Sequence, residues 1–118
     1  MATTTDLSRL ALALPGMEGE GVNFGVGRRA VCWAYLARAR PKSKREAVPG
    51  VVAIRCDIAA KDMLIEAAPD RFFDDDHYRG YPAVLVRLEA IEVAELQALL
   101  EAGWRIQAPP SFRKSKAI

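Results

Sequence analysis

The sequence predicts a two-layer α+β domain, in which an antiparallel five-stranded sheet carries helices on one face. Three observations lead to this fold class. The 118 residues suit a single domain spanning the whole chain, 1–118. The apolar residues switch between helical and strand periods in the order α-β-β-β-α-β-β-α. Several links are short enough for hairpins, which favours antiparallel pairing.

The first element is a short amphipathic helix. It begins at an N-cap among residues 4–6 and stops at Pro15-Gly16. Its apolar residues recur at helical spacing: Leu7, Leu10, Ala11 and Leu14. Residues 17–27 are rich in glycine and predict a loop into a first strand. They do not complete a phosphate-binding fingerprint, because Phe24 stands where G-x-G-x-x-G requires glycine.

A strand over residues 30–37 follows, with alternating sides, and Gly27-Arg28 permits a hairpin with the strand before it. Residues 38–50 are then expected to form a basic loop, since Pro41 and Pro49 cannot sit inside a sheet ladder. Val51–Cys56 predicts the third strand.

Asp57 is placed to cap a second helix. The apolar pattern puts Ala60, Met63, Leu64 and Ala67 on its buried face, and Lys61, Asp62 and Glu66 outward. Two strands follow, at Phe72-Phe73 and at residues 83–88, around a polar and aromatic turn. The last and longest helix covers residues 92–107, and its buried face is Val93, Leu96, Leu100 and Trp104.

Charge is unevenly distributed along the chain, although the net charge is only +2. Residues 28–45 contain seven basic residues and no acid, and the tail, residues 111–118, adds Arg113, Lys114 and Lys116. Residues 57–77 are mainly acidic. Such segregation predicts one positive and one negative face.

Several function classes are disfavoured by composition. No apolar run is long enough to span a membrane and no leader pattern opens the chain, so a cytoplasmic protein is expected. Cys32 and Cys56 lie apart in predicted strands and are expected to be free, buried thiols. Asp74, Asp75, Asp76 and His77 could ligate a metal, but adjacent residues diverge in extended chain, so a solvated acidic turn is expected. No catalytic residues, metal or cofactor are predicted.

The stretch HYRGYPAVLVRL, residues 77–88, resembles the MmcQ/YjbR family of small bacterial proteins. The resemblance extends to residues 11–19, to Ala68-Pro69-Asp70-Arg71-Phe72-Phe73 and to residues 95–109. It implies the same α+β element order. Members of the family are commonly labelled DNA-binding, and the family has no catalytic motif to carry over. The basic loop at 38–50 is longer than is usual in the family.

The basic loop and the family label together predict weak, largely sequence-independent DNA binding, although a plain solvated hairpin explains the loop equally well. The predicted contacts, with Tyr78 as a stacking ring, are Arg28, Arg29, Arg38, Arg40, Lys42, Lys44, Arg45, Tyr78 and Arg79. Trp33, Tyr35 and Trp104 are expected in the core, whereas Tyr78 and Tyr81 can be half-buried or offered to a partner.

Two alternatives remain open. The element order resembles that of bacterial secretion chaperones, which implies a surface for a partner protein or peptide. The second alternative is a small-molecule or metal site around Asp74, Asp76 and His77. The chain is expected to be a monomer or a weak dimer.

Overall fold

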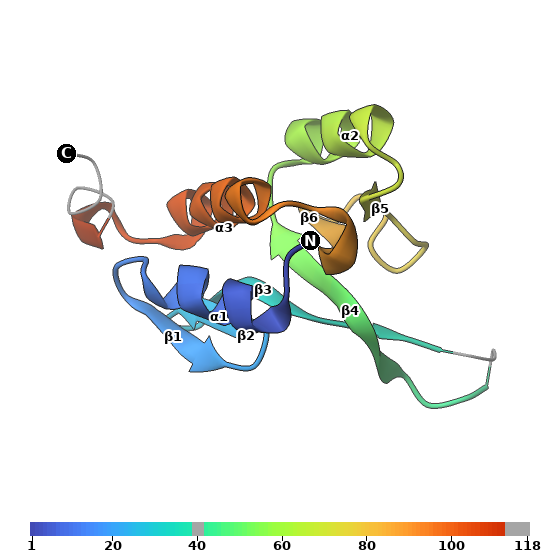
Figure 1. Cartoon of the computed structure of the whole chain (residues 1–118), viewed down its shortest axis with the longest axis horizontal. Helices are drawn as coiled ribbons and strands as arrows, with labels where there is room; N and C mark the ends of the chain where they lie inside the picture. Colours follow the sequence, from blue (N-terminus) through green and yellow to red (C-terminus); the bar gives the residue numbers. More distant parts are fainter. Residues whose placement is uncertain (39–41, 113–118) are drawn as a thin grey trace.

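The fold was determined as a computed structural model that describes residues 1–38 and 42–112. Within these residues, a six-stranded antiparallel sheet has the strand order β1-β2-β3-β4-β6-β5 (Figure 1). In chain order the elements are α1 (Thr4–Leu12), β1 (Met17–Glu20), β2 (Asn23–Val26), β3 (Arg29–Ala37), β4 (Glu46–Arg55), α2 (Ile58–Ala67), β5 (Phe72–Phe73), β6 (Ala83–Arg87), the 3₁₀ turn η1 (Leu88–Ala90) and α3 (Val93–Gln107).

The predicted α+β class and antiparallel sheet are confirmed, but the strand count of five is too low. The glycine-rich residues 17–27 form a hairpin of two strands, β1 and β2, rather than a loop into one. Gly21 turns the chain between them at a φ of 62°, a conformation that glycine adopts without a steric penalty. The second hairpin, at Gly27-Arg28, is confirmed by the pairing of Val26 with Arg29.

Helices α1 and α3 cover one face of the sheet and enclose the larger core. Helix α1 begins one residue earlier than predicted, because Thr3 is its N-cap and forms a capping box with Asp6. Helix α3 follows the prediction closely: Leu96, Leu100 and Trp104 are buried. The indole Nε1 of Trp104 donates to the carbonyl of Pro15 at 2.8 Å, which joins α3 to the end of α1.

A bulge at the start of β3 breaks the alternation that the sequence predicts there. Phe24 pairs with Cys32 and Gly25 with Ala30, so Val31 is left without a partner in β2. As a result Val31 and Cys32 both belong to the helix-side core. Beyond the bulge, Trp33, Tyr35 and Ala37 belong to the second, smaller core on the opposite face.

The opposite face of the sheet is covered by the segment between β5 and β6, here called the aromatic loop (residues 74–82). Tyr78 from this loop packs with Tyr35, Ala53 and Leu85 of the sheet. The aromatic loop therefore covers the core on this face of the sheet, as helices α1 and α3 cover the core on the other face.

The far end of β3 and the start of β4 extend beyond the rest of the sheet (Figure 1). The segment is here called the basic arm (residues 36–50, of which the structure describes 36–38 and 42–50). The loop predicted over 38–50 is therefore too long, since β4 already starts at Glu46. Pro49 is accommodated because residues 48–51 bulge opposite Tyr35 alone, between the pairs Leu36–Ala47 and Ala34–Val52.

None of the helices in the described ranges combines the length and the apolar character needed to cross a membrane.

Candidate nucleic-acid interface and aromatic pocket

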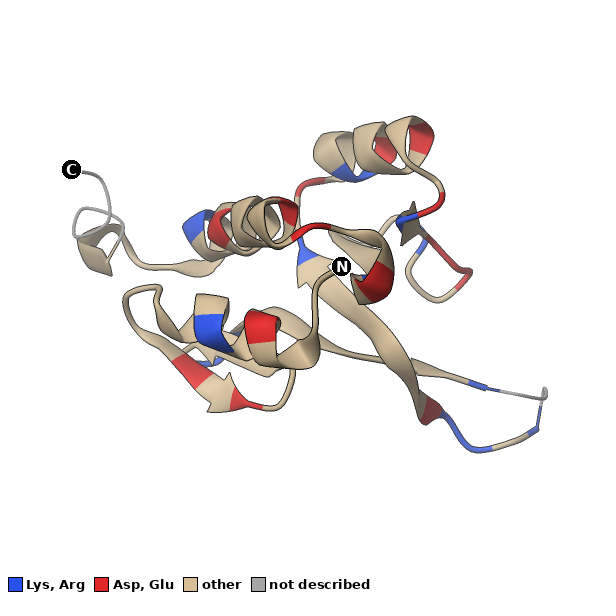
Figure 2. Ribbon diagram, viewed as in Figure 1, with Lys and Arg blue, Asp and Glu red and all other residues tan. Residues whose placement is uncertain are grey.

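The basic arm projects at one end of the molecule, and Lys and Arg residues gather on it (Figure 2). The sequence of residues 36–50 contains five basic residues and a single acid, Glu46. Arg38, Lys42 and Lys44 are exposed, and Arg45 is half-buried, with its guanidinium donating to the carbonyl of Leu36 at 3.3 Å. Arg40 lies outside the described residues, as do the tail residues Arg113, Lys114 and Lys116.

Arg28 and Arg29 are not brought to the arm. They are exposed in and beside the turn between β2 and β3, whereas the arm begins at the other end of β3. At about 3.3 Å per residue, the length of β3 separates the two groups by roughly 25 Å. The predicted contact residues therefore form two separate groups.

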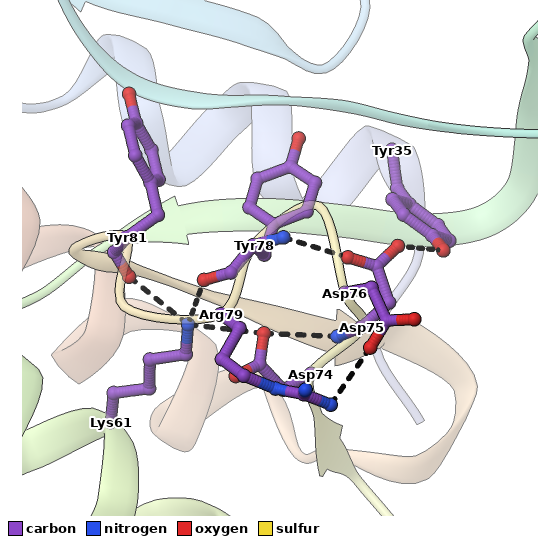
Figure 3. Close-up of polar contacts among 8 residues, drawn as sticks. All are labelled: Tyr35, Lys61, Asp74, Asp75, Asp76, Tyr78, Arg79 and Tyr81. Atoms are coloured by element: carbon purple, nitrogen blue, oxygen red, sulfur yellow. Dashed lines mark hydrogen bonds and ion pairs between the residues drawn. The ribbon is translucent and has the colours of Figure 1, made fainter.

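The aromatic loop is held to α2 by a buried lysine (Figure 3). Lys61 is only 2% exposed. Its Nζ donates to the carbonyls of Tyr78 at 2.6 Å and Tyr81 at 3.0 Å, and forms an ion pair with Asp74 at 3.1 Å. A buried ammonium group with three acceptors satisfies its hydrogen-bonding capacity, and in doing so it fixes both ends of the turn.

This position of Lys61 corrects the face assigned to α2. The residues of α2 that turn inward are Lys61, Leu64 and Ile65, whereas Met63, predicted to be buried, is 70% exposed. The helix is rotated by about one residue, or 100°, from the predicted orientation. Asp57 is confirmed as its N-cap, with Oδ1 accepting from the amide of Ala60 at 2.7 Å.

The acidic turn is solvated only in part, contrary to expectation. Asp74 binds Lys61, and Asp75 accepts from the hydroxyl of Tyr35 and from the amide of Tyr78. Asp76 and His77 match the prediction, since both are exposed. The side chain of Asp76 is 93% exposed and pairs with Arg79 at 2.8 Å. Across the described residues, no three His, Cys, Asp or Glu side chains gather as a metal site.

Tyr78 is 7% exposed, which corrects its predicted role as a stacking ring. Its ring packs edge-on against Tyr35, and its hydroxyl accepts from Trp33 Nε1 at 3.0 Å. Tyr81, which the site prediction omitted, presents the exposed ring at 41%. The repeated aromatic residues around Gly80 pointed to this turn, but not to which ring is outermost.

Trp33, His77, Tyr78 and Tyr81 line a pocket of about 330 Å³, here called the aromatic pocket. Trp33 and Tyr81 meet edge to face with centroids 6.3 Å apart. The guanidinium of Arg55 lies over both rings, 5.3 Å from the centroid of Trp33 and 5.1 Å from that of Tyr81, and donates to the Tyr81 hydroxyl at 3.1 Å. Trp33 is thus a pocket residue, only partly buried, and not simply a core residue.

A second hollow, of about 340 Å³, lies between the aromatic loop and the root of the basic arm. Arg38 and Arg45 line it from the arm, and Asp75, Asp76 and His77 from the loop. His77 therefore borders both the hollow and the aromatic pocket. The carboxylates of Asp75 and Asp76 therefore offset part of the positive charge at the root of the arm.

Neither thiol has the properties of a nucleophile. Cys32 and Cys56 are free and buried, as expected. Burial raises the pKa of Cys32 to about 12 and that of Cys56 to about 11, so both are protonated at neutral pH.

Comparison with known proteins places the chain among bacterial relatives. No family model matches it. The Mycobacterium tuberculosis "Uncharacterized protein Rv2570" is 38% identical over 120 residues, covering 92% of this chain and 91% of that protein. The Mycobacterium bovis "Uncharacterized protein Mb2600" matches to the same extent.

A solved structure shares the fold. The crystal structure of Deinococcus radiodurans protein DR2400, a DUF419 domain, superposes with a TM-score of 0.63 over 100% of this chain and 90% of that one. The two sequences are 17% identical, so this likeness shows the fold alone. The chain belongs to the family of the mycobacterial proteins, and its fold is that of the DUF419 domain.

Proposed function

We propose that the chain is a non-catalytic nucleic-acid-binding domain of the MmcQ/YjbR type, and that it contacts the phosphate backbone through the basic arm. The observation that carries the proposal is the arm itself, a projecting hairpin whose described cations Arg38, Lys42 and Lys44 are exposed. The relation of the DUF419 fold to MmcQ/YjbR-like folds supports the family assignment.

The geometry favours contacts to phosphates over the reading of bases. A two-stranded hairpin with long basic side chains can follow a backbone, and such contacts carry no sequence information by themselves. Helix α3, the longest helix, is packed against β3 and β4 and carries acidic residues, including Glu95 and Glu101. The proposed binding is therefore largely independent of sequence and strongly dependent on salt.

The test is a fluorescence anisotropy titration of duplex DNA between about 50 and 200 mM salt. The arm variant Lys42→Gln/Lys44→Gln removes two exposed charges from the arm. Two lost phosphate contacts flatten the slope of log affinity against log salt by about 1.8. The matched control, Arg28→Gln/Arg29→Gln, removes two charges from the other end of β3 and is expected to leave the slope nearly unchanged.

Equal effects of the two variants would mean that net charge, and not the arm, governs binding. No measurable affinity of the native chain for any duplex or single strand at low salt would remove the proposal.

A peptide-binding module is the second candidate, and one observation favours it. In the described part of the chain, β4 pairs with β6 only from Val51 onward, so residues 46–50 have a strand on one side only. An extended peptide could add to that free edge. Binding of this kind persists at high salt, where phosphate contacts are screened.

A further inference from the structure

The aromatic pocket has the size and lining of a site for a flat ligand. Its volume of about 330 Å³ lies at the lower end of the range of small-molecule sites, which is about 300–1,000 Å³. All four lining residues, Trp33, His77, Tyr78 and Tyr81, carry rings. The Tyr78 hydroxyl accepts from Trp33 Nε1 and the Tyr81 hydroxyl accepts from Arg55, so each hydroxyl keeps its own hydrogen to donate. These two hydroxyls and His77 are the polar groups that can orient a ligand.

Arg55 gives this pocket a positive charge. Its guanidinium covers the rings of Trp33 and Tyr81, and within the described residues it forms no ion pair with a carboxylate. Its Nε is buried and makes no hydrogen bond in the structure. An uncompensated guanidinium beside aromatic rings favours a ligand that is both aromatic and anionic, and a nucleotide has both properties.

The pocket and the root of the basic arm are connected through His77, which borders both the pocket and the hollow that Arg38 and Arg45 line. Beneath this surface, Trp33 lies four residues before Ala37 on β3, and Ala37 already belongs to the arm. Four residues of strand span about 13 Å, a distance that a few nucleotides of single strand can cover. Of the carboxylates on this path, Asp76 pairs with Arg79 at 2.8 Å, which offsets part of its repulsion of a passing phosphate.

We propose that the aromatic pocket accepts an unpaired nucleobase, and that the chain consequently prefers single-stranded nucleic acid to duplex. In a duplex the faces of the bases are already stacked on one another, so only an unpaired base can enter and stack on the rings. This inference rests on the proposed function: the arm holds the phosphates, and the pocket around Arg55 and Tyr81 holds one base.

The experiment compares labelled oligothymidine with a duplex of equal length in anisotropy titrations at one salt concentration. We expect the native chain to bind the single strand at least about 10-fold more tightly. Tyr81→Ala removes an exposed ring and is expected to weaken single-strand binding about 10-fold with no effect on the duplex. Tyr81→Phe keeps the ring and is expected to retain the preference.

Phe112→Ala is the matched control, because Phe112 is also an exposed aromatic residue, 37% exposed, and packs near Gly16 away from the pocket. It is expected to bind both nucleic acids as the native chain does. A second readout is tryptophan emission: oligothymidine should quench it in the native chain and much less in Trp33→Phe, since the remaining Trp104 is fully buried.

Four outcomes contradict the inference. Equal affinity of the native chain for single strand and duplex, or equal losses for both in Tyr81→Ala, would exclude a base in the pocket while leaving the arm proposal intact. Binding of a proline-rich peptide that Tyr81→Ala abolishes, with unchanged oligothymidine affinity, would assign the pocket to a peptide. Failure of the native chain to bind either nucleic acid overturns both proposals.

Discussion

Lys61 is the one charged residue that the described part of the chain buries. Burying a lysine costs free energy unless its ammonium group is fully partnered, and here two carbonyls and a carboxylate surround it. Those partners belong to the aromatic loop, which lacks a regular ladder of its own. The loop therefore owes its shape to a side chain from another element, and the aromatic pocket depends on that shape.

Lys61→Met tests this dependence. The substitution keeps much of the apolar stem but leaves the carbonyls of Tyr78 and Tyr81 and the carboxylate of Asp74 without their partner. Removing one partner of a buried pair is expected to lower the free energy of unfolding by about 3 kcal/mol. Urea denaturation followed by circular dichroism measures the change.

Lys42→Met is the control, because it removes an exposed lysine and should change the stability by less than about 0.5 kcal/mol. A loss below about 1 kcal/mol for Lys61→Met would show that water replaces the ammonium group at little cost, against this account.

Among the elements, α3 packs directly against β3 and β4. Gly103 allows the close approach: a Cβ at this position would lie 2.8 Å from the carbonyl oxygen of Arg55 and 3.2 Å from Val31 Cγ1. Helix propensity alone favours alanine here, since glycine costs a helix interior about 1 kcal/mol. Packing decides the outcome, because a backbone atom at 2.8 Å cannot move aside cheaply.

Gly103→Ala is therefore expected to destabilise the protein by about 1–3 kcal/mol, in spite of its higher helix propensity. Gln97→Ala, an exposed position on the same helix, is the control and should be neutral or slightly stabilising. Thermal unfolding followed by circular dichroism compares the two. A stabilised Gly103→Ala variant would mean that α3 lies farther from β4 than described.

The arm depends on the bulge at residues 48–51. Gly50 adopts a φ of 77° there, and nothing lies within 4 Å of a Cβ at this position. Gly50→Ala is therefore expected to cost about 1–2 kcal/mol through backbone strain alone. Gly50→Asn should cost less, because asparagine tolerates the left-handed region better than alanine. Equal chemical-denaturation midpoints for the two variants would contradict this explanation.

For the whole molecule, two buried thiols and one buried tyrosine hydroxyl make the free energy of unfolding fall at alkaline pH. Burial raises the pKa of Cys32 from 9.0 to about 12 and that of Cys56 to about 11. Burial, followed by the hydrogen bond to Asp75, raises the pKa of Tyr35 from 10.0 to about 12. At a pH between its unfolded and folded pKa, each group is protonated in the folded protein but ionised in the unfolded chain. Unfolding at such a pH therefore releases a proton, and the unfolded state becomes more favourable as the pH rises.

The stabilisation is complete below the unfolded pKa values and is lost as pH rises through the folded ones, over roughly pH 9 to 12. Between about pH 8 and about pH 10.5, Cys32 alone is expected to lower the free energy of unfolding by roughly 2 kcal/mol. Urea titrations under reducing conditions measure it. Between the same two pH values, the free energy of unfolding of Cys32→Ala should fall less than that of the native chain. An equal fall in both proteins would exclude this thiol as the cause.

Much of the architecture follows from local pattern. The helical spacing of residues 93–104, the turn at Gly27-Arg28 and the cap at Asp57 each depend on neighbours a few residues away, and each was predicted from the sequence. The basic charge of the arm is likewise a property of composition. The hairpin of β1 and β2 was missed because its glycine-rich strands show too little side-chain alternation to distinguish them from a loop.

The candidate site depended on contacts that no local pattern contains. Sequence alone determined that a basic segment and an aromatic turn exist. Only the tertiary structure decided that Lys61 is buried under Tyr78 and that Arg28 and Arg29 lie far from the arm. It also decided that the Tyr81 ring is exposed and that the guanidinium of Arg55 lies over the rings of Trp33 and Tyr81. The reason is physical: the partners in these contacts are 17 or more residues apart, and their burial is set by the packing of whole elements against one another.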